Sequence, residues 1–162
     1  MKIVTLDFEV FAHDWLVVIK DHATKNYTVI WNDNEAFRSC LDDEYIYVGF
    51  NIKHYDQFIM KAIAAGLTPE EVKEVNDYII VHHMEGWTYP PLKDFYFKAN
   101  IVDVMDDMQK GQSLKSIEGH LCMNIKETDV DFDLDRPLTA DEKVLTENYC
   151  RHDVDATEKI FD

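Results

Sequence analysis

The chain has 162 residues and a mass of 19.0 kDa, which suits a single domain with its own hydrophobic core. Hydrophobic residues make up 46% of the sequence and aromatic residues 12%, and these fractions exclude an intrinsically disordered chain. The formal net charge of −16 is unusual for a nucleic-acid-binding protein, because phosphate groups attract a basic surface. An acidic chain can still bind phosphate where divalent cations reverse the local charge, or where another polypeptide region supplies a basic groove.

The cysteines and the N-terminus bear on the cellular compartment. Cys40, Cys122 and Cys150 are widely spaced and form no Cys-x-x-Cys pair, which argues against a disulfide framework and against a zinc knuckle. The apolar run between Lys2 and Asp7 is too short for a signal peptide, and no apolar stretch is long enough to cross a bilayer. We therefore expect a soluble cytoplasmic protein without a membrane partner.

The first half of the chain predicts four strands and one short helix. Segments rich in β-branched and apolar residues, separated by turn-like residues, indicate a three-stranded meander followed by a fourth strand. A short helix that contains Ala36, Phe37 and Leu41 is expected between the third and fourth strands, capped within Asn32–Asn34. The expected strands cover residues 2–8, 15–20, 27–31 and 45–50.

The second half predicts mostly helices. Apolar residues at helical spacing over 54–65 indicate a helix closed by Gly66. Capping boxes at Thr68 and Thr139 begin two further helices, the first running towards Val81 and the second to the end of the chain. Between these helices we expect an aromatic loop, a strand and a short helix, at 84–97, 100–105 and 113–121. The whole pattern predicts an α/β fold with helices around a mixed sheet.

Three carboxylates stand at the ends of predicted elements in the first part of the chain. Asp7 and Glu9 are two residues apart at the end of the first strand, so their side chains share one face. Asp56 follows at the junction between the fourth strand and the next helix, where ligands bind in open α/β sheets. Each acid also has a simpler structural explanation: a solvated strand end for the pair, and a first-turn acid that favours the helix dipole for Asp56.

The last helix adds a further acid and a tyrosine. Tyr149 and Asp153 are four residues apart and so lie on one face, which we expect to include the core-type residues Leu145, Ala156 and Ile160. An acid on an apolar face is costly unless it is paired or bound to a metal, although it can instead lie at the solvated edge. Hard oxygen ligands gathered from three elements favour magnesium or manganese over zinc.

The order and spacing of these residues resemble the DEDD exonuclease superfamily, in its tyrosine-bearing subgroup, over nearly the whole chain. The longer strings YVGFNIKHYDQFIM and NYCRHDVDATEKIF are similar to the proofreading exonuclease domains of phage and bacterial DNA polymerases. The three motifs of the family are matched by Asp7-Phe8-Glu9, by Asn51-Ile52-Lys53-His54-Tyr55-Asp56 and by Tyr149-Cys150-Arg151-His152-Asp153.

The resemblance implies a ribonuclease H-like α/β fold, a mixed five-stranded sheet flanked by helices, in one exonuclease domain over 1–162. This domain would be the N-terminal part of a longer DNA polymerase, because the last helix lacks a stop signal. It also implies two divalent cations, Mg²⁺ or Mn²⁺, that help to ionise water and stabilise the leaving 3′ oxygen. Asp7, Glu9, Asp56 and Asp153 would hold the cations, and Tyr149 would orient the attacking water. Tyr149, Asp7 and Glu9 are thus the expected catalytic residues.

The implied substrate is the single-stranded 3′ end of DNA, and the implied partner is a polymerase region or subunit. Asn51 and Tyr55 would hold the terminal nucleotide, and Lys115 and Arg151 are candidate phosphate contacts. Asp103, at a predicted strand end, is a possible additional acid outside the ligand set. If a phage encodes the chain, it acts in the host cytoplasm.

Two alternatives remain open from the sequence. One is an exoribonuclease of the same superfamily, because no residue recognisably reads the 2′-hydroxyl group. The other is a non-catalytic acidic module that mimics DNA, which the charge of −16 favours and the complete set of motifs disfavours.

Overall fold

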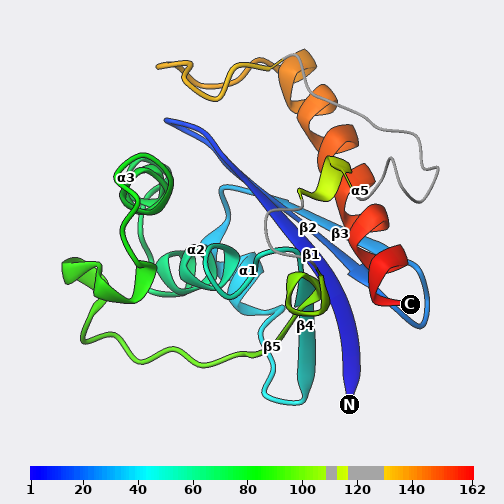
Figure 1. The fold of residues 1–162 in the computed structure, drawn as a ribbon. Helices are drawn as coiled ribbons and strands as arrows, with labels where there is room; N and C mark the ends of the chain where they lie inside the picture. The colour runs from blue at the N-terminus through cyan, green and yellow to red at the C-terminus, as the bar shows by residue number, and fades with distance from the viewer. Residues whose placement is uncertain (109–112, 117–129) are drawn as a thin grey trace.

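The computed structural model describes residues 1–108, 113–116 and 130–162, and it centres on a five-stranded mixed sheet (Figure 1). The strand order is β3-β2-β1-β4-β5. β1 is antiparallel to β2 and β2 to β3, whereas β4 is parallel to both β1 and β5. The strands are β1 (Lys2–Val10), β2 (Trp15–Asp21), β3 (Tyr27–Trp31), β4 (Tyr45–Gly49) and β5 (Asn100–Asp103). The expected α/β class, the meander and the mixed five-stranded sheet are confirmed.

Helices cover both faces of the sheet (Figure 1). The first three pack on one face, and the long C-terminal helix α5 crosses the other. Alternation along β2 explains how one strand serves both layers: Trp15 and Val17 point to the first layer, and Leu16 and Val18 to α5. The helices are α1 (Asn34–Arg38), α2 (Asp56–Ala64), α3 (Pro69–Ile80) and α5 (Ala140–Phe161), with short 3-10 helices η1 (Gly86–Thr88), η2 (Pro90–Leu92) and η3 (Val104–Asp107).

Local signals determine several helix ends as predicted. The Thr68 and Thr139 hydroxyls accept hydrogen bonds from the third helical residue, and the glutamates at those positions bond back. Both capping boxes are therefore confirmed. Gly66 adopts φ +88° just after α2, a left-handed conformation that glycine takes without steric cost.

Other boundaries differ from the prediction. The short helix α1 ends at Arg38, so Leu41 lies outside it. β1 continues to Val10, so Asp7 and Glu9 lie inside the strand. β5 ends at Asp103 instead of residue 105, because the Asp103 side chain accepts the Met105 N–H and begins η3.

The expected aromatic loop at 84–97 contains the two short helices η1 and η2. Residues 114–116 are helical, and the rest of the expected 113–121 helix lies outside the described residues, as does Cys122. Over the described ranges, none of the helices combines the length and apolar character needed to cross a membrane.

The buried face of α5 is also shifted from the predicted one. Leu145 is 53% exposed, whereas Ala156 is buried as expected. The fully buried positions are Thr146, Cys150 and Val154, one residue out of phase with Leu145. A shift of one residue turns a helix by about 100°, enough to move a predicted core residue into solvent.

Candidate metal centre

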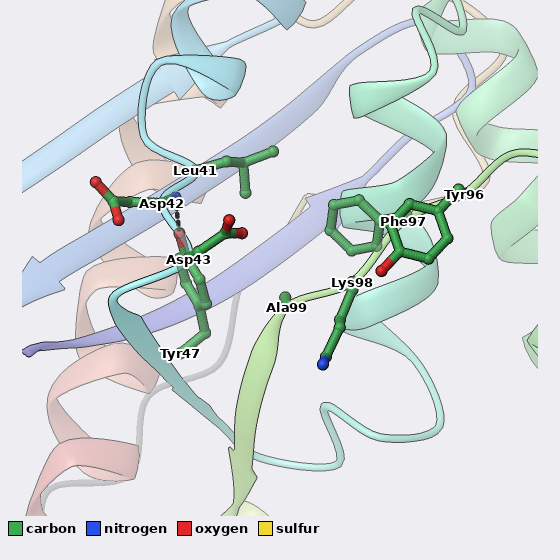
Figure 2. Close-up of a pocket in the computed structure, with 8 residues that line it drawn as sticks. All are labelled: Leu41, Asp42, Asp43, Tyr47, Tyr96, Phe97, Lys98 and Ala99. Carbon is green, nitrogen blue, oxygen red and sulfur yellow. Dashed lines mark hydrogen bonds between the residues drawn. The ribbon is translucent and has the colours of Figure 1, made fainter.

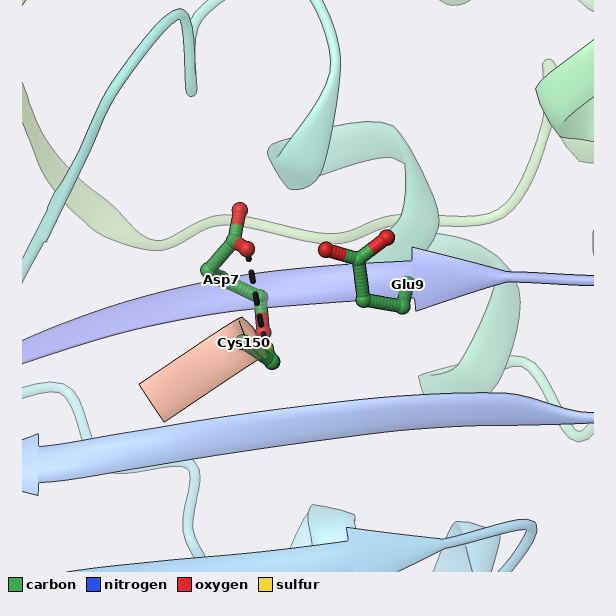
Figure 3. A group of neighbouring side chains, drawn as sticks. All are labelled: Asp7, Glu9 and Cys150. Carbon is green, nitrogen blue, oxygen red and sulfur yellow. Dashed lines mark hydrogen bonds between the residues drawn. The ribbon is translucent and has the colours of Figure 1, made fainter. Parts of the chain in front are cut away.

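Asp7 and Glu9 project side by side from β1 towards the α5 layer (Figure 3). Their neighbours Leu6 and Phe8 point into the opposite core, where Phe8 meets the Phe37 ring edge-on at 5.6 Å. Phe8 therefore packs in the core while the acids on either side of it face the other way. β4 pairs with β1 only as far as Thr5, so the segment with the two acids has an open edge on that side.

Cys150 on α5 reaches this pair of acids. Its sulfur lies 3.5 Å from both the main-chain oxygen and Oδ2 of Asp7, and ligand atoms of Asp7, Glu9 and Cys150 all lie within 4.8 Å of one another. Burial, reinforced by the nearby carboxylates, raises the pKa of the Cys150 thiol. The thiol therefore stays protonated and donates to Asp7. Sequence reasoning missed this contact, although Cys150 belongs to the third motif.

Asp56 joins the group from the first turn of α2. Its side chain is almost fully buried, and its Oδ1 atom has no hydrogen-bond partner among the described residues. Burial raises the pKa of Asp56 to about 7; the main-chain N–H groups of Asp56 and Phe8 oppose this shift and the charge of Asp103 adds to it. A buried carboxylate oxygen without a donor is costly, and a cation would satisfy it.

Asp153 completes the set of four carboxylates. It is 7% exposed, and its charge acts on both β1 acids: the pKa values of Asp7 and Glu9 are raised well above their usual range, chiefly by burial and then by the neighbouring carboxylates. Lys115 donates to Asp153 Oδ1 at 2.6 Å, so the expected phosphate contact pairs with an expected metal ligand.

Tyr149 lies one turn before Asp153 and faces the same group. Burial raises the pKa of its hydroxyl, and the charges of Asp153, Glu9 and Asp7 raise it further. The ammonium group of Lys115 lies 4.8 Å from the centre of the Tyr149 ring. The hydroxyl is therefore neutral at physiological pH in the cation-free protein, which suits it to hydrogen bonding.

The two predicted substrate residues of the second motif, Asn51 and Tyr55, differ in their hydrogen bonding. Tyr55 lies beside the carboxylates, which together with burial raise its pKa, and its hydroxyl donates to Asn76 at 2.5 Å. Asn51 has φ +60°, and its main-chain N–H donates to Asp103. Within the described part of the chain, the Asn51 side chain makes no hydrogen bond.

Arg151, the other candidate phosphate contact, does not face this group. It packs against the Tyr27 ring and bonds Glu147.

A cavity of ≈ 360 Å³ opens directly beside the acids. Glu9 and Tyr55 lie on its inner side, where Asn76 supplies an amide. Its apolar lining includes Ile80 from α3 and Phe132, which stacks on Phe11 at 4.8 Å. The charged residues Lys73, Asp77 and Asp133 also line the cavity, so its wall is mixed.

A second cavity, of ≈ 500 Å³, lies where β4 and β5 begin, away from the carboxylates (Figure 2). The Tyr47 hydroxyl at its base is already used, since it accepts from the Asp42 N–H and donates to the Cys40 carbonyl, both at 2.9 Å. Its remaining polar groups, from Asp43 and Lys98, are exposed. None of the predicted site residues lines this cavity.

The group of carboxylates fits divalent cations by the chemistry of its donors. Burial and the charges of Asp56 and Asp153 raise the pKa values of Asp7 and Glu9, and burial raises that of Asp56. Among the described residues, the Lys115 ammonium opposes the shift at Glu9. Oxygen donors of this kind suit Mg²⁺ or Mn²⁺. The chain matches no known protein family, no curated protein and no solved structure.

Proposed function

We propose that this chain is a 3′→5′ exonuclease that removes terminal nucleotides from DNA with the help of two divalent cations. The observation that carries the proposal is the convergence of Asp7, Glu9, Asp56 and Asp153 on one edge of the sheet. Burial and neighbouring carboxylates raise the pKa values of Asp7 and Glu9, and among the described residues Lys115 is the cation that pairs with the group, at Asp153. The arrangement of the sheet and helices is compatible with the ribonuclease H-like fold that this activity would use.

The carboxylates, Tyr149 and Lys115 would each have a different role in the reaction. The four carboxylates would hold the cations, which when bound lower the pKa of water and stabilise the charge that develops on the leaving oxygen. Tyr149, held neutral by its surroundings, would orient the attacking water through its hydroxyl and would not remove a proton. Lys115 would exchange its partner Asp153 for a substrate phosphate once cations neutralise the acid.

The cavity beside Glu9 supports a nucleotide as the substrate. Its volume of ≈ 360 Å³ is within the range of small-ligand sites. Phe132 and Ile80 give a surface on which a base can stack, and Asn76 offers an amide for polar contacts. Stacking on an aromatic ring tolerates any base, as an exonuclease that removes every nucleotide requires.

The charge of the chain sets the strength of binding. Two divalent cations would neutralise the four carboxylates but leave most of the net charge of −16. We therefore propose that the isolated chain binds single-stranded DNA weakly and with strong salt dependence, and that a basic polymerase region or subunit supplies the remaining attraction.

A degradation assay tests the function. Single-stranded DNA labelled at its 5′ end should shorten stepwise with Mg²⁺ or Mn²⁺, should persist with a chelator, and should persist with the Asp7→Ala variant. Asp43→Ala, an exposed acid far from the site, is the matched control and should keep full activity. Wild-type activity in Asp7→Ala would refute the proposed metal centre.

Two further measurements distinguish this function from the two alternative ones. A matched RNA oligonucleotide degraded faster than DNA would identify an exoribonuclease. If calorimetry detects no binding of Mn²⁺, the chain is better explained as an acidic module that mimics DNA, because such a module has no need of a cation site.

A further inference from the structure

Asp103 holds an unusual set of main-chain hydrogen bonds beside the metal centre. It ends β5, opposite Gly49 of β4, and is 4% exposed. Oδ1 accepts the N–H groups of Asn51 at 2.8 Å and Met105 at 3.0 Å, and Oδ2 accepts the N–H of Lys53 at 3.0 Å. The Asp103 carboxylate thus connects the end of β5, through hydrogen bonds, to the turn that follows β4.

This turn carries the chain from β4 to Asp56. Asn51 adopts φ +60°, a left-handed conformation that is uncommon for residues other than glycine, although asparagine tolerates it better than most. The turn is also tight, because a Cβ atom on Gly49 would lie 2.8 Å from the Cβ of Ile52. Such a conformation persists only where its surroundings hold it, and two of the Asp103 hydrogen bonds do so.

The same turn leads without interruption into α2. The carbonyl of Asn51 accepts the N–H of Tyr55 at 3.1 Å, and the carbonyl of Ile52 accepts the N–H of Gln57 at 3.1 Å. Asp56 lies between these two donors. Its position therefore follows from the turn, and the position of the turn follows from Asp103.

Both oxygens of Asp103 act as acceptors, which a neutral amide could not match. The carboxylate also adds a negative charge near Asp56, which is unfavourable while the acids lack a cation. The same charge becomes favourable when a cation binds. Groups that orient metal ligands from outside the ligand set change metal affinity by about 10- to 100-fold when they are replaced.

We propose that Asp103 is a positioning residue of the metal centre, which fixes the 51–55 turn so that Asp56 is preorganised for a divalent cation. This inference rests on the proposed function. It adds a residue that would contact neither the cation nor the substrate but determines how well the site binds cations.

Calorimetric titration of the full chain with Mn²⁺ tests the inference. Asp103→Asn keeps the size of the side chain but replaces one acceptor oxygen with a donor group, so Mn²⁺ affinity should fall by about tenfold or more. Asp14→Asn is the matched control, since Asp14 is also buried and accepts the Leu138 N–H at 2.8 Å, but belongs to a different part of the fold. It should cost stability without changing Mn²⁺ affinity.

A double-mutant cycle makes the test specific to Asp56. In an Asp56→Asn background, Asp103→Asn should produce a much smaller further loss of Mn²⁺ affinity, because the ligand that it positions is already gone. If Asp103→Asn does not fold, the comparison is repeated in an Asn51→Gly background, where glycine adopts the left-handed conformation without strain.

The outcomes distinguish this inference from the proposed function. If the wild type does not bind Mn²⁺, both fail. If the wild type binds Mn²⁺ and Asp103→Asn binds it equally well, only the role of Asp103 is refuted. Equal losses in Asp103→Asn and Asp14→Asn would also refute that role, because they would reflect general destabilisation.

Discussion

The Cys150 sulfur lies 3.5 Å from both the main-chain oxygen and Oδ2 of Asp7, so α5 is hydrogen-bonded to β1 at the candidate metal centre. Cys150 is fully buried and packs against Leu16 and Val18 of β2. One side chain therefore joins the helix that carries Tyr149 to the central strand. Replacing Cys150, or the neighbouring Asp56 and Tyr149, should therefore change the stability or the activity of the protein.

Replacing Cys150 with alanine should destabilise the protein. The variant removes a thiol donor next to a buried acid and leaves a small void, so the free energy of unfolding should fall by about 1–2 kcal/mol, measured by urea denaturation. Cys40→Ala is the control, because the Cys40 thiol also donates to a main-chain oxygen at 3.5 Å but is only partly buried. Equal losses for both variants would contradict a special role for Cys150.

The cation-free protein should lose stability as pH rises. The pKa of Asp56 is raised from 3.8 to about 7 in the folded state, so its stabilising contribution is complete below about pH 3.8 and is lost as pH rises through about 7. The full effect is on the order of 4 kcal/mol. Urea denaturation with a chelator at pH 5 to 8 should show a steeper decline for the wild type than for Asp56→Asn. Parallel curves would show that Asp56 does not contribute.

Removing the Tyr149 hydroxyl should affect turnover and leave cation binding intact. Tyr149→Phe should lower kcat by about 10²-fold, while the Kd for Mn²⁺ measured by calorimetry stays unchanged. Because the pKa of Tyr149 is raised above its ordinary value of 10.0, wild type and variant should share the same pH profile of kcat up to pH 10. An alkaline inflection lost in Tyr149→Phe would instead indicate that the phenolate takes part.

Phe132 should contribute to substrate binding more than to chemistry. It lines the cavity beside Glu9 and is 37% exposed. If it stacks on a base, Phe132→Ala should raise KM for single-stranded DNA several-fold with kcat nearly constant, because the contact is made equally before and during the reaction. Phe132→Leu should be intermediate. An unchanged KM would mean that Phe132 serves only to cover Phe11.

His13 should make stability depend on pH near neutrality. Its ring bonds Glu70 at 3.1 Å and Asp135 at 2.8 Å, and these two hydrogen bonds raise the pKa of His13 above 6.5. The stabilisation is therefore complete below about pH 6.5 and is lost as pH rises through the higher folded value. The Tm of the wild type should fall more between pH 6 and 8 than that of His13→Gln. His83→Gln, an exposed control, should behave like the wild type.

The parts of the fold that could be predicted from the sequence are those that local patterns determine. The runs of β-branched and apolar residues in β1 to β4 and the capping boxes at Thr68 and Thr139 act within a few residues, and the corresponding elements formed as expected. The predictions that were wrong depend on more distant groups. Leu145 is exposed because packing on the sheet decides the helical phase, and β5 is short because Asp103 begins η3.

For the site, the sequence by itself determined which side chains are available: the acids, their spacing within each element, and a tyrosine one turn before Asp153. That Asp153 neighbours Glu9 was implied only by the family resemblance. Nothing in the sequence indicated that Lys115 pairs with Asp153 or that Cys150 bonds Asp7 across 143 positions of the chain. Only the tertiary structure decided these contacts, because they depend on the order of strands in the sheet and on the face that α5 covers. Periodicity carries information over a few residues, whereas the pKa of each acid depends on charges brought near it from distant parts of the chain.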